Sequence, residues 1–301
     1  MLTLVNPTFT IDTPHKKKKR ETAPAKGLEN KYSRSLETVA EEVERIIKRN
    51  LKKLTPQAVN KTIRELTKYS GKLFDWSKWI SSTIIYAANN DSEKVWSNIS
   101  RTMSYELKRK INKAPVGTLM KQYLDDQVKL ITSMPLTAAQ KVHDLLLGKQ
   151  LIEGKRATTL EEEIMRIGNI TRNRARLIAR TETSKITTGL TMARAKAIGV
   201  DWYIWRTSED IRVRSSHKVM QDVLVSWGDP PSPEKLEGKK SYGTYHAGST
   251  FNCRCYPEPV VDLEDIKFPA KVYKNGVITR MARAKFLSIA GGIVENNKYA
   301  H

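Results

Sequence analysis

The chain has only two cysteines among its 301 residues, and both lie in the string Asn252-Cys253-Arg254-Cys255. Two cysteines this close in sequence cannot cross-link so long a chain, so a disulfide-stapled secreted scaffold is excluded and a reducing compartment fits better. No run of about 18 apolar residues occurs, so we expect no membrane-spanning helix. The opening string MLTLVNPTFT has no basic segment before an apolar one and does not resemble a secretory signal.

Acidic residues are also scarce. The chain has 32 Asp and Glu against 53 Lys and Arg, which leaves a formal net charge of +21. A field of that sign attracts polyanions, meaning nucleic acid or an anionic membrane surface. The alternative is a lysine-rich surface that only keeps the protein soluble. We expect contact with a polyanion of one of these kinds.

Residues 1–30 are expected to form a basic flexible arm, because they combine three prolines with a run of like charges that repel one another. This run is the candidate DNA contact, since each neutralised phosphate releases counterions. The alternatives are a solvated tail or a string that resembles a nuclear-localisation signal. The run consists of Lys16, Lys17, Lys18, Lys19 and Arg20.

Residues 31–150 are predicted to form a helical domain without chemistry of its own. Apolar residues recur at three- and four-residue steps from Leu36 to Leu54, which predicts one helix with a single buried stripe. Further helices are predicted at about 57–70, 73–88, 92–112 and 116–131, with a boundary marked by Pro135 and residues 148–156. The tryptophans of this region are interpreted as core or subunit-interface residues rather than base-stacking ones; they are Trp76, Trp79 and Trp96.

Residues 151–262 are predicted to form a small mixed α/β module, so the fold class is α+β. Thr159 and Glu162 match a capping box, and a long helix is expected from a cap at Thr171 to a stop at Gly199. A strand is expected within 200–213, then a long irregular loop at 228–250, and then an edge strand that contains prolines.

Residues 263–301 are interpreted as a C-terminal hairpin extension. Asn275-Gly276 lies between two alternating segments and suits a type I′ turn.

Polar residues gather at the two ends of the segment from Asp210 to Cys255. Arginine forks pair well with carboxylates in half-buried places, so we interpret the cluster first as an ion network that pins the strand onto the long helix. Such pairs add little net stability, although they specify geometry. The network would join Asp210, Arg212 and Arg214 to Arg180 and Glu182.

A metal site is the second interpretation of this segment. His217, His246, Cys253 and Cys255 supply two imidazoles and two thiols, the ligand set of structural Zn²⁺. The C-x-C spacing is tighter than the usual C-x₂₋₄-C, so no cofactor is assigned and zinc stays an alternative. In the opposing interpretation the two cysteines point to opposite faces of a short strand and the histidines bond to backbone.

Catalysis is the third interpretation. A cysteine beside a histidine can be a nucleophile pair, but no oxyanion feature can be located in the sequence. His217, His246 and Asn252 would suit a His-Asn-His-type nuclease, which needs a helix directly after its hairpin. Pro257 and Pro259 prevent a helix there.

The order of these motifs resembles the phage Mu F-like minor head protein family, also called phage head morphogenesis proteins. The resemblance covers roughly residues 155–262 and departs from the family after His217 and just before Asn252. It is carried by Ala179-Arg180-Thr181-Glu182-Thr183, then Trp205, Thr207, Asp210, Arg212, Val213, Arg214, Ser216 and His217, then Asn252, Cys253, Arg254 and Cys255.

The resemblance implies a minor capsid protein of a tailed bacteriophage, assembled in the host cytoplasm and located inside the head near the portal. Its implied partners are the portal protein, the major capsid or scaffolding protein, and DNA bound without sequence preference. It implies no enzymatic activity. Two alternatives stay open: a metal-dependent nuclease or other nucleic-acid-processing enzyme, and a DNA-binding protein unrelated to virions.

Overall fold

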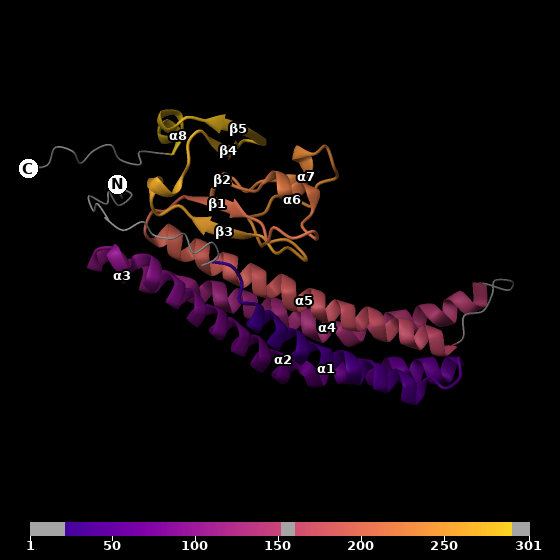
Figure 1. Cartoon of the computed structure of the whole chain (residues 1–301). Helices are drawn as coiled ribbons and strands as arrows, with labels where there is room; N and C mark the ends of the chain where they lie inside the picture. The colour runs from indigo at the N-terminus through magenta and orange to yellow at the C-terminus, as the bar shows by residue number, and fades with distance from the viewer. Residues whose placement is uncertain (1–21, 152–159, 291–301) are drawn as a thin grey trace, which may run out of the picture. The chain divides into compact units, whose positions relative to one another are not determined.

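The computed structural model of the protein describes residues 22–151 and 160–290. The basic run from Lys16 to Arg20 lies outside the described residues, as does Thr159 of the expected capping box. The predicted α+β class is confirmed: long helices make up the first part of the chain, and a five-stranded sheet follows (Figure 1). Among the described residues no helix is long and apolar enough to cross a membrane.

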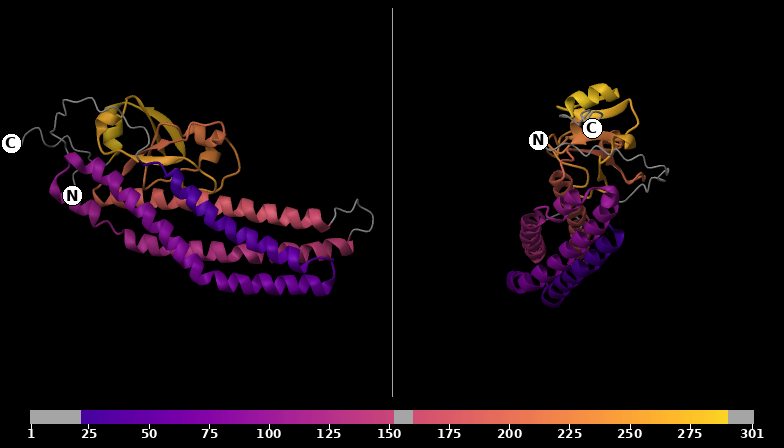
Figure 2. Two further views of the ribbon diagram at one scale, coloured as in Figure 1. Left: turned by 60° about the horizontal axis from the view of Figure 1, so that its bottom comes forward. Right: turned by 90° about the vertical axis from the view of Figure 1, so that its left-hand side faces the viewer.

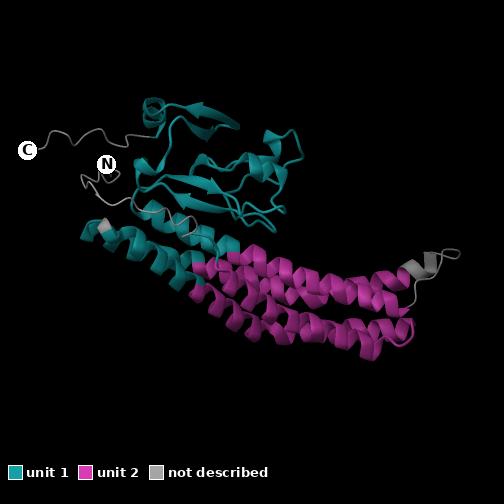
Figure 3. Cartoon of the chain, in the orientation of Figure 1, with its two compact units in different colours: residues 1–24, 88–119, 184–301 teal, residues 25–87, 120–183 magenta. Residues whose placement is uncertain are grey.

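The chain divides into two compact units (Figure 3). The described residues within 25–87 and 120–183 form what we call the helical unit, and those within 1–24, 88–119 and 184–301 form the sheet unit. This division differs from the domain boundaries expected at residues 150 and 262, because three long helices each contribute residues to both units.

The helical unit is built from parts of four helices, which pack apolar stripes against one another. These helices are α1 (Lys26–Asn50), α2 (Pro56–Ile99), α4 (Val116–Leu151) and α5 (Leu160–Ala197). The predicted stripe of α1 is confirmed, because Leu36, Val43 and Ile47 are fully buried. Since α1 begins at Lys26, the last residues assigned to the flexible arm are helical. The unit's core also takes Leu66 from α2.

Three predicted breaks in the helices are wrong. The helices expected at 57–70 and 73–88, together with the first part of the one expected at 92–112, are one helix, α2. It passes through Gly71 because buried neighbours such as Leu73 outweigh the cost of about 1 kcal/mol for a helical glycine. Pro135 lies inside α4 instead of ending it. Pro135 leaves the Ile131 carbonyl without its helical donor, and one residue along Ser70 Oγ of α2 donates to the Thr132 carbonyl at 2.7 Å.

The helix expected to begin at Thr171 begins earlier, at Leu160. Gly168 is not a break: a Cβ there would lie 3.0 Å from Glu44 Oε2, so the glycine lets α1 approach α5. Thr171 is not a cap either, because its hydroxyl donates to the Ile167 carbonyl at 2.8 Å inside the helix. The predicted stop at Gly199 is confirmed by its positive φ of 78°.

The sheet has the strand order β3-β1-β2-β4-β5. Its strands are β1 (Trp202–Arg206), β2 (Val223–Ser226), β3 (Tyr256–Pro259), β4 (Ala270–Lys274) and β5 (Val277–Met281). All neighbours are antiparallel except the parallel pair β2 and β4. The predicted proline-containing edge strand is confirmed as β3. Short elements join the strands: η1 (Ser100–Thr102), α3 (Tyr105–Asn112), α6 (Ser215–Val219), α7 (Pro233–Leu236), η2 (Leu263–Asp265) and α8 (Arg283–Ile289).

The C-terminal hairpin belongs to this sheet, so its interpretation as an extension is wrong. The type I′ turn itself is confirmed, with φ of 48° at Asn275 and 88° at Gly276. Because β4 pairs with β2, the hairpin continues the sheet beyond residue 262. Helix α8 then covers one face (Figure 2), where Phe286 packs on Trp202 with ring centroids 5.1 Å apart.

Both faces of β1 are buried within the sheet unit. Trp202 and Ile204 of β1 face the core that includes α8, whereas Tyr203 and Trp205 face a second core. The second core also takes Trp96 from α2 and contains both cysteines. A strand whose successive side chains enter two different cores is apolar at every position, and β1 shows this pattern in the string WYIW.

Arg194 of α5 provides a test of this unit. Its buried guanidinium donates to Ser92 Oγ at 2.9 Å and to Asn89 Oδ1 at 2.8 Å. Arg194→Met leaves both acceptors buried without their partner, so we expect the free energy of unfolding to fall by about 2–4 kcal/mol. Arg166→Met, at an exposed ion pair with Glu163, should leave the urea midpoint almost unchanged. Equal midpoints for the two variants would contradict this packing.

Candidate functional site

Three buried side chains meet in the sheet unit: His217 from α6, and Cys253 and Cys255 from the segment that precedes β3. The Sγ atoms of Cys253 and Cys255 lie 3.5 Å and 3.4 Å from the same atom, His217 Nδ1. All three potential ligand atoms lie within 4.8 Å of one another. The imidazole is held in place by the Trp205 ring, which packs edge-on with centroids 5.6 Å apart.

The local backbone explains why both cysteines point the same way. Residues 253–255 are not a strand, so side chains need not alternate. Asn252 has a φ of 54°, and the Cys253 N–H closes a turn onto the Thr250 carbonyl at 3.3 Å. The Cys255 N–H then donates to Cys253 Sγ at 3.4 Å. The expectation that the two cysteines point to opposite faces is therefore wrong.

A chain of hydrogen bonds fixes the histidine from its other side. His217 Nε2 lies 3.1 Å from the Tyr245 hydroxyl, which donates to Glu234 Oε1 at 2.5 Å. Burial and the Glu234 carboxylate raise the pKa of Tyr245 well above its usual value, so this hydroxyl stays a donor. Because it donates to Glu234, it accepts from His217 Nε2–H, which leaves the Nδ1 lone pair directed at the sulfur atoms.

The two thiols titrate as a pair. The hydrogen bond from Cys255 holds the pKa of Cys253 below that of a free thiol. The same hydrogen bond, together with burial, raises the pKa of Cys255. The arrangement therefore favours one thiolate and one thiol while the two share a proton.

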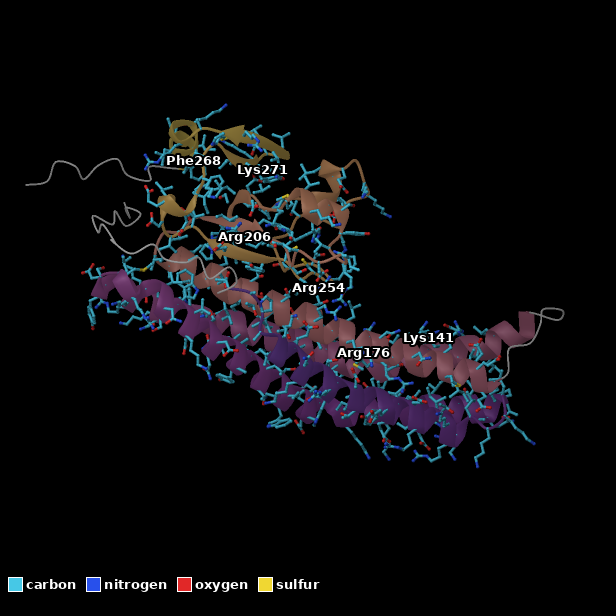
Figure 4. All side chains as sticks on the ribbon, viewed as in Figure 1. Lys141, Arg176, Arg206, Arg254, Phe268 and Lys271 are labelled. Carbon is cyan, nitrogen blue, oxygen red and sulfur yellow. The ribbon has the colours of Figure 1, made fainter. Side chains whose placement is uncertain are left out.

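A small cavity of about 50 Å³ adjoins the cluster. Its lining includes Arg212, Arg214 and Arg254 in addition to the histidine and both cysteines. Arg254 (labelled in Figure 4) binds Asp210 with both arms of its fork, at 2.7 Å for Nη2 to Oδ1. Arg214 is held in place as well, because its Nη2 donates to the Phe251 carbonyl at 2.7 Å.

Arg214 also belongs to a stack on the surface. Its guanidinium carbon lies 4.3 Å from the centroid of the Phe251 ring and 5.8 Å from that of Tyr242. The two aromatic rings meet edge to face at 5.0 Å, and both are partly exposed.

The predicted polar cluster is only partly brought together. Asp210 pairs with Arg254, and the predicted network between Asp210 and Arg180 stays a prediction. Arg180 and Glu182 lie in the helical unit, where Arg180 donates to Glu29 at 2.9 Å and Glu182 is buried.

The predicted metal set is brought together except for His246. That imidazole instead lies 3.2 Å from the Tyr203 hydroxyl, with its ring edge-on to Trp227 at 5.1 Å. Sequence reasoning also missed Glu234 and Tyr245, which belong to the irregular loop. No motif marks them, because their role depends on how that loop folds back over α6.

Comparison with known proteins agrees with the resemblance. Residues 140–257 match the model of the family described as phage Mu protein F like protein, which confirms the predicted family over that segment. The matched segment includes α6, the irregular loop and all three members of the cluster.

The chain is also similar to an uncharacterized protein of Haemophilus influenzae, at 31% identity over 151 residues. The alignment covers 50% of this chain and 30% of that relative, so the chain spans less than a third of the relative's length. No solved structure matches the chain.

Gly248 tests how tightly the loop is packed beside the cysteines. It has a φ of 86°, and a Cβ there would lie 2.6 Å from Thr188 Oγ1 and 2.9 Å from the Cys255 carbonyl. Gly276 has nearly the same φ, 88°, with nothing within 4 Å, and serves as the matched control. The positive φ should lower the free energy of unfolding of both alanine variants by about 1–2 kcal/mol. Gly248→Ala should lower it by about 1–3 kcal/mol more, the usual cost of overpacking. Equal losses in urea unfolding would contradict the close approach.

His246 makes stability depend on pH. Burial, with a smaller contribution from Lys196, lowers the pKa of His246 from 6.5 to about 4. The unfolded chain therefore binds this proton more readily than the folded one, and the free energy of unfolding should fall as the pH falls from 6.5 towards 4. His246→Gln should flatten the profile in this window, measured by urea titration at several pH values. Parallel profiles for the two proteins would contradict the buried neutral imidazole.

Proposed function

We propose that this protein is a minor head protein of a tailed bacteriophage that associates with the portal, contacts packaged DNA and has no catalytic activity of its own. The observation that carries the proposal is the family match over residues 140–257, which contains the buried cluster and the loop around it. The matched relative spans well beyond this chain, so the function of the whole relative is not transferred.

Exposed aromatic side chains on α2 support assembly with other proteins. Trp79 and Tyr86 are each 63% exposed and stand seven residues apart, so they share one face of the helix. Large exposed aromatic residues of this kind carry much of the binding energy at protein interfaces. We propose that this face of the helical unit binds the portal. If it binds the major capsid or scaffolding protein instead, that protein replaces the portal as its partner.

The charge of the chain supports contact with DNA. The net charge is +21, and in the sheet unit the chain segments that supply Arg214 and Tyr242 of the stack also carry exposed lysines. Such a surface neutralises phosphates without reading bases. The exposed lysines are Lys218, Lys239 and Lys240.

A metal-dependent nuclease is the second candidate, favoured by an arginine-lined cavity beside potential metal ligands. The cavity volume argues against it: about 50 Å³ admits a few water molecules, whereas small-molecule sites measure about 300–1,000 Å³. Incubation of the pure protein with plasmid and Mg²⁺ or Zn²⁺ separates the two candidates. Cleavage that is lost in His217→Ala would replace our proposal with the nuclease.

The portal association has a direct test. The protein, added to purified portal rings or procapsids, should co-sediment with them, and it should appear in the mass spectrum of purified virions. Trp79→Ser with Tyr86→Ser should reduce co-sedimentation about 100-fold or more, because interface aromatics often contribute 2 kcal/mol or more each. The control is Leu177→Ser, at another exposed apolar position of the helical unit. A protein that is absent from purified heads would contradict the proposal.

The DNA contact has a separate test. Affinity for double-stranded DNA should fall linearly with salt on a log–log plot, and replacement of the five basic residues 16–20 should reduce the slope by up to about 4–5. Binding that does not change with salt would contradict a phosphate contact.

A further inference from the structure

We propose that His217, Cys253 and Cys255 bind one Zn²⁺ ion through Nδ1 and two Sγ atoms, with the fourth position facing the adjoining cavity. Tyr245 and Glu234 act as positioning residues that hold the imidazole for the metal. This inference is independent of the proposed virion role, since a structural metal ion would serve any protein with this module.

The distances between the ligand atoms fit a tetrahedral ion. Zn–S and Zn–N bonds of about 2.3 Å and 2.0–2.1 Å at tetrahedral angles place sulfur and nitrogen about 3.5 Å apart. The two observed separations from His217 Nδ1 are 3.5 Å and 3.4 Å. Both sulfur atoms meet this requirement at once, on a backbone turn that brings Cys253 and Cys255 to the same side.

Counting donors and acceptors gives a second argument. With Nε2–H bonded to Tyr245, His217 Nδ1 has one lone pair, and two thiols are directed at it. One thiol can donate to that lone pair while the other donates to the first sulfur atom, so hydrogen bonding alone does not require both sulfur atoms to lie at the same distance from Nδ1. A cation that accepts the lone pair and two thiolates satisfies all three groups.

The surroundings supply the outer contacts that metal ligands require. Metal-bound histidines donate their other N–H to a carboxylate or similar acceptor, and here the acceptor is Tyr245, backed by the buried Glu234 carboxylate. The Cys255 N–H donates to Cys253 Sγ, as it would to a thiolate ligand. Ser216 Oγ also donates to Glu234 Oε1, at 3.2 Å, which fixes the carboxylate.

Charge and ligand type select the metal. Two thiolates, a neutral imidazole and Zn²⁺ sum to no net charge, which a buried site tolerates. Thiolate and imidazole ligands favour zinc over the hard cations Mg²⁺ and Ca²⁺. Among the described residues no fourth His, Cys, Asp or Glu completes the group, and the cavity of about 50 Å³ has room for a water ligand.

The first experiment is a titration of the full-length, chelator-treated and reduced protein with Co²⁺. We expect one Co²⁺ to bind per chain, with a thiolate-to-metal charge-transfer band in the near ultraviolet and the intense visible bands of tetrahedral cobalt. Zn²⁺ should displace the cobalt and abolish the colour. A folded wild-type protein that shows neither band, or that releases the metal on simple gel filtration, overturns the proposal.

Variants assign the ligands. His217→Gln, Cys253→Ser and Cys255→Ser should each weaken Zn²⁺ affinity by more than about 100-fold, measured by competition with a chromophoric chelator. Tyr245→Phe should weaken it by about 10–100-fold, the usual effect of losing an outer contact. His246→Gln is the matched control, since it removes a nearby histidine of the same loop that lies outside the cluster, and it should keep wild-type affinity.

Two results would give the cluster a different role. If His246→Gln weakens binding as much as His217→Gln does, the ligand set is wrong. The second result is a purified protein that carries no metal and whose mass shows a Cys253–Cys255 disulfide. If this disulfide is reduced and then forms again although Zn²⁺ is present, the cysteines are a redox pair and the proposal fails. Circular dichroism shows whether each variant folds. If a variant does not fold, the cobalt spectrum of the wild-type protein still tests whether the cluster binds metal.

Discussion

The arrangement of the sheet unit depends on one imidazole that is held on both sides. His217 Nε2 is directed at Tyr245, and Nδ1 is directed at two buried sulfur atoms. These contacts join a five-residue helix, the irregular loop and the segment before the edge strand, none of which has much regular hydrogen bonding of its own. A loop of more than 20 residues without a ladder costs conformational entropy, and a shared buried cluster is the interaction that offsets it.

The matched family segment is not a complete structural unit. It ends at residue 257, yet β2 has β4 as its neighbour on one side, and β4 begins at Ala270. Without the C-terminal hairpin, β2 would become an edge strand and the core beside Phe286 would be open to solvent. The hairpin is therefore part of the structure that holds the cluster, although the family match does not include it.

Elements with strong local signals could be predicted from the sequence. The Asn275-Gly276 turn, the proline-containing edge strand and the stop at Gly199 each follow from backbone preferences of one or two residues. The break expected at Pro135 and the helix start expected at Thr171 failed because packing against another helix outweighed a local cost. Gly168 in particular is explained only by Glu44, which lies far away in sequence.

The candidate site shows the same limit. The residue types of His217, Cys253 and Cys255 indicated a metal or a nucleophile, but their convergence depends on the turn at Asn252, which no spacing rule predicts. His246 was grouped with them by residue type alone, whereas the fold places it against Tyr203. Glu234 and Tyr245 could not be predicted as partners of His217, because only the three-dimensional path of the loop brings them to its imidazole.

The central claim is that the buried cluster, with the Zn²⁺ ion that we propose for it, holds α6 and the loop in place. Hydrogen–deuterium exchange of the Zn²⁺-loaded protein, before and after addition of a chelator, tests it most directly. The account predicts faster exchange on metal removal at residues 215–220 and 245–256, with little change in the helical unit. Unchanged exchange at those residues, or a uniform increase throughout the chain, would contradict it.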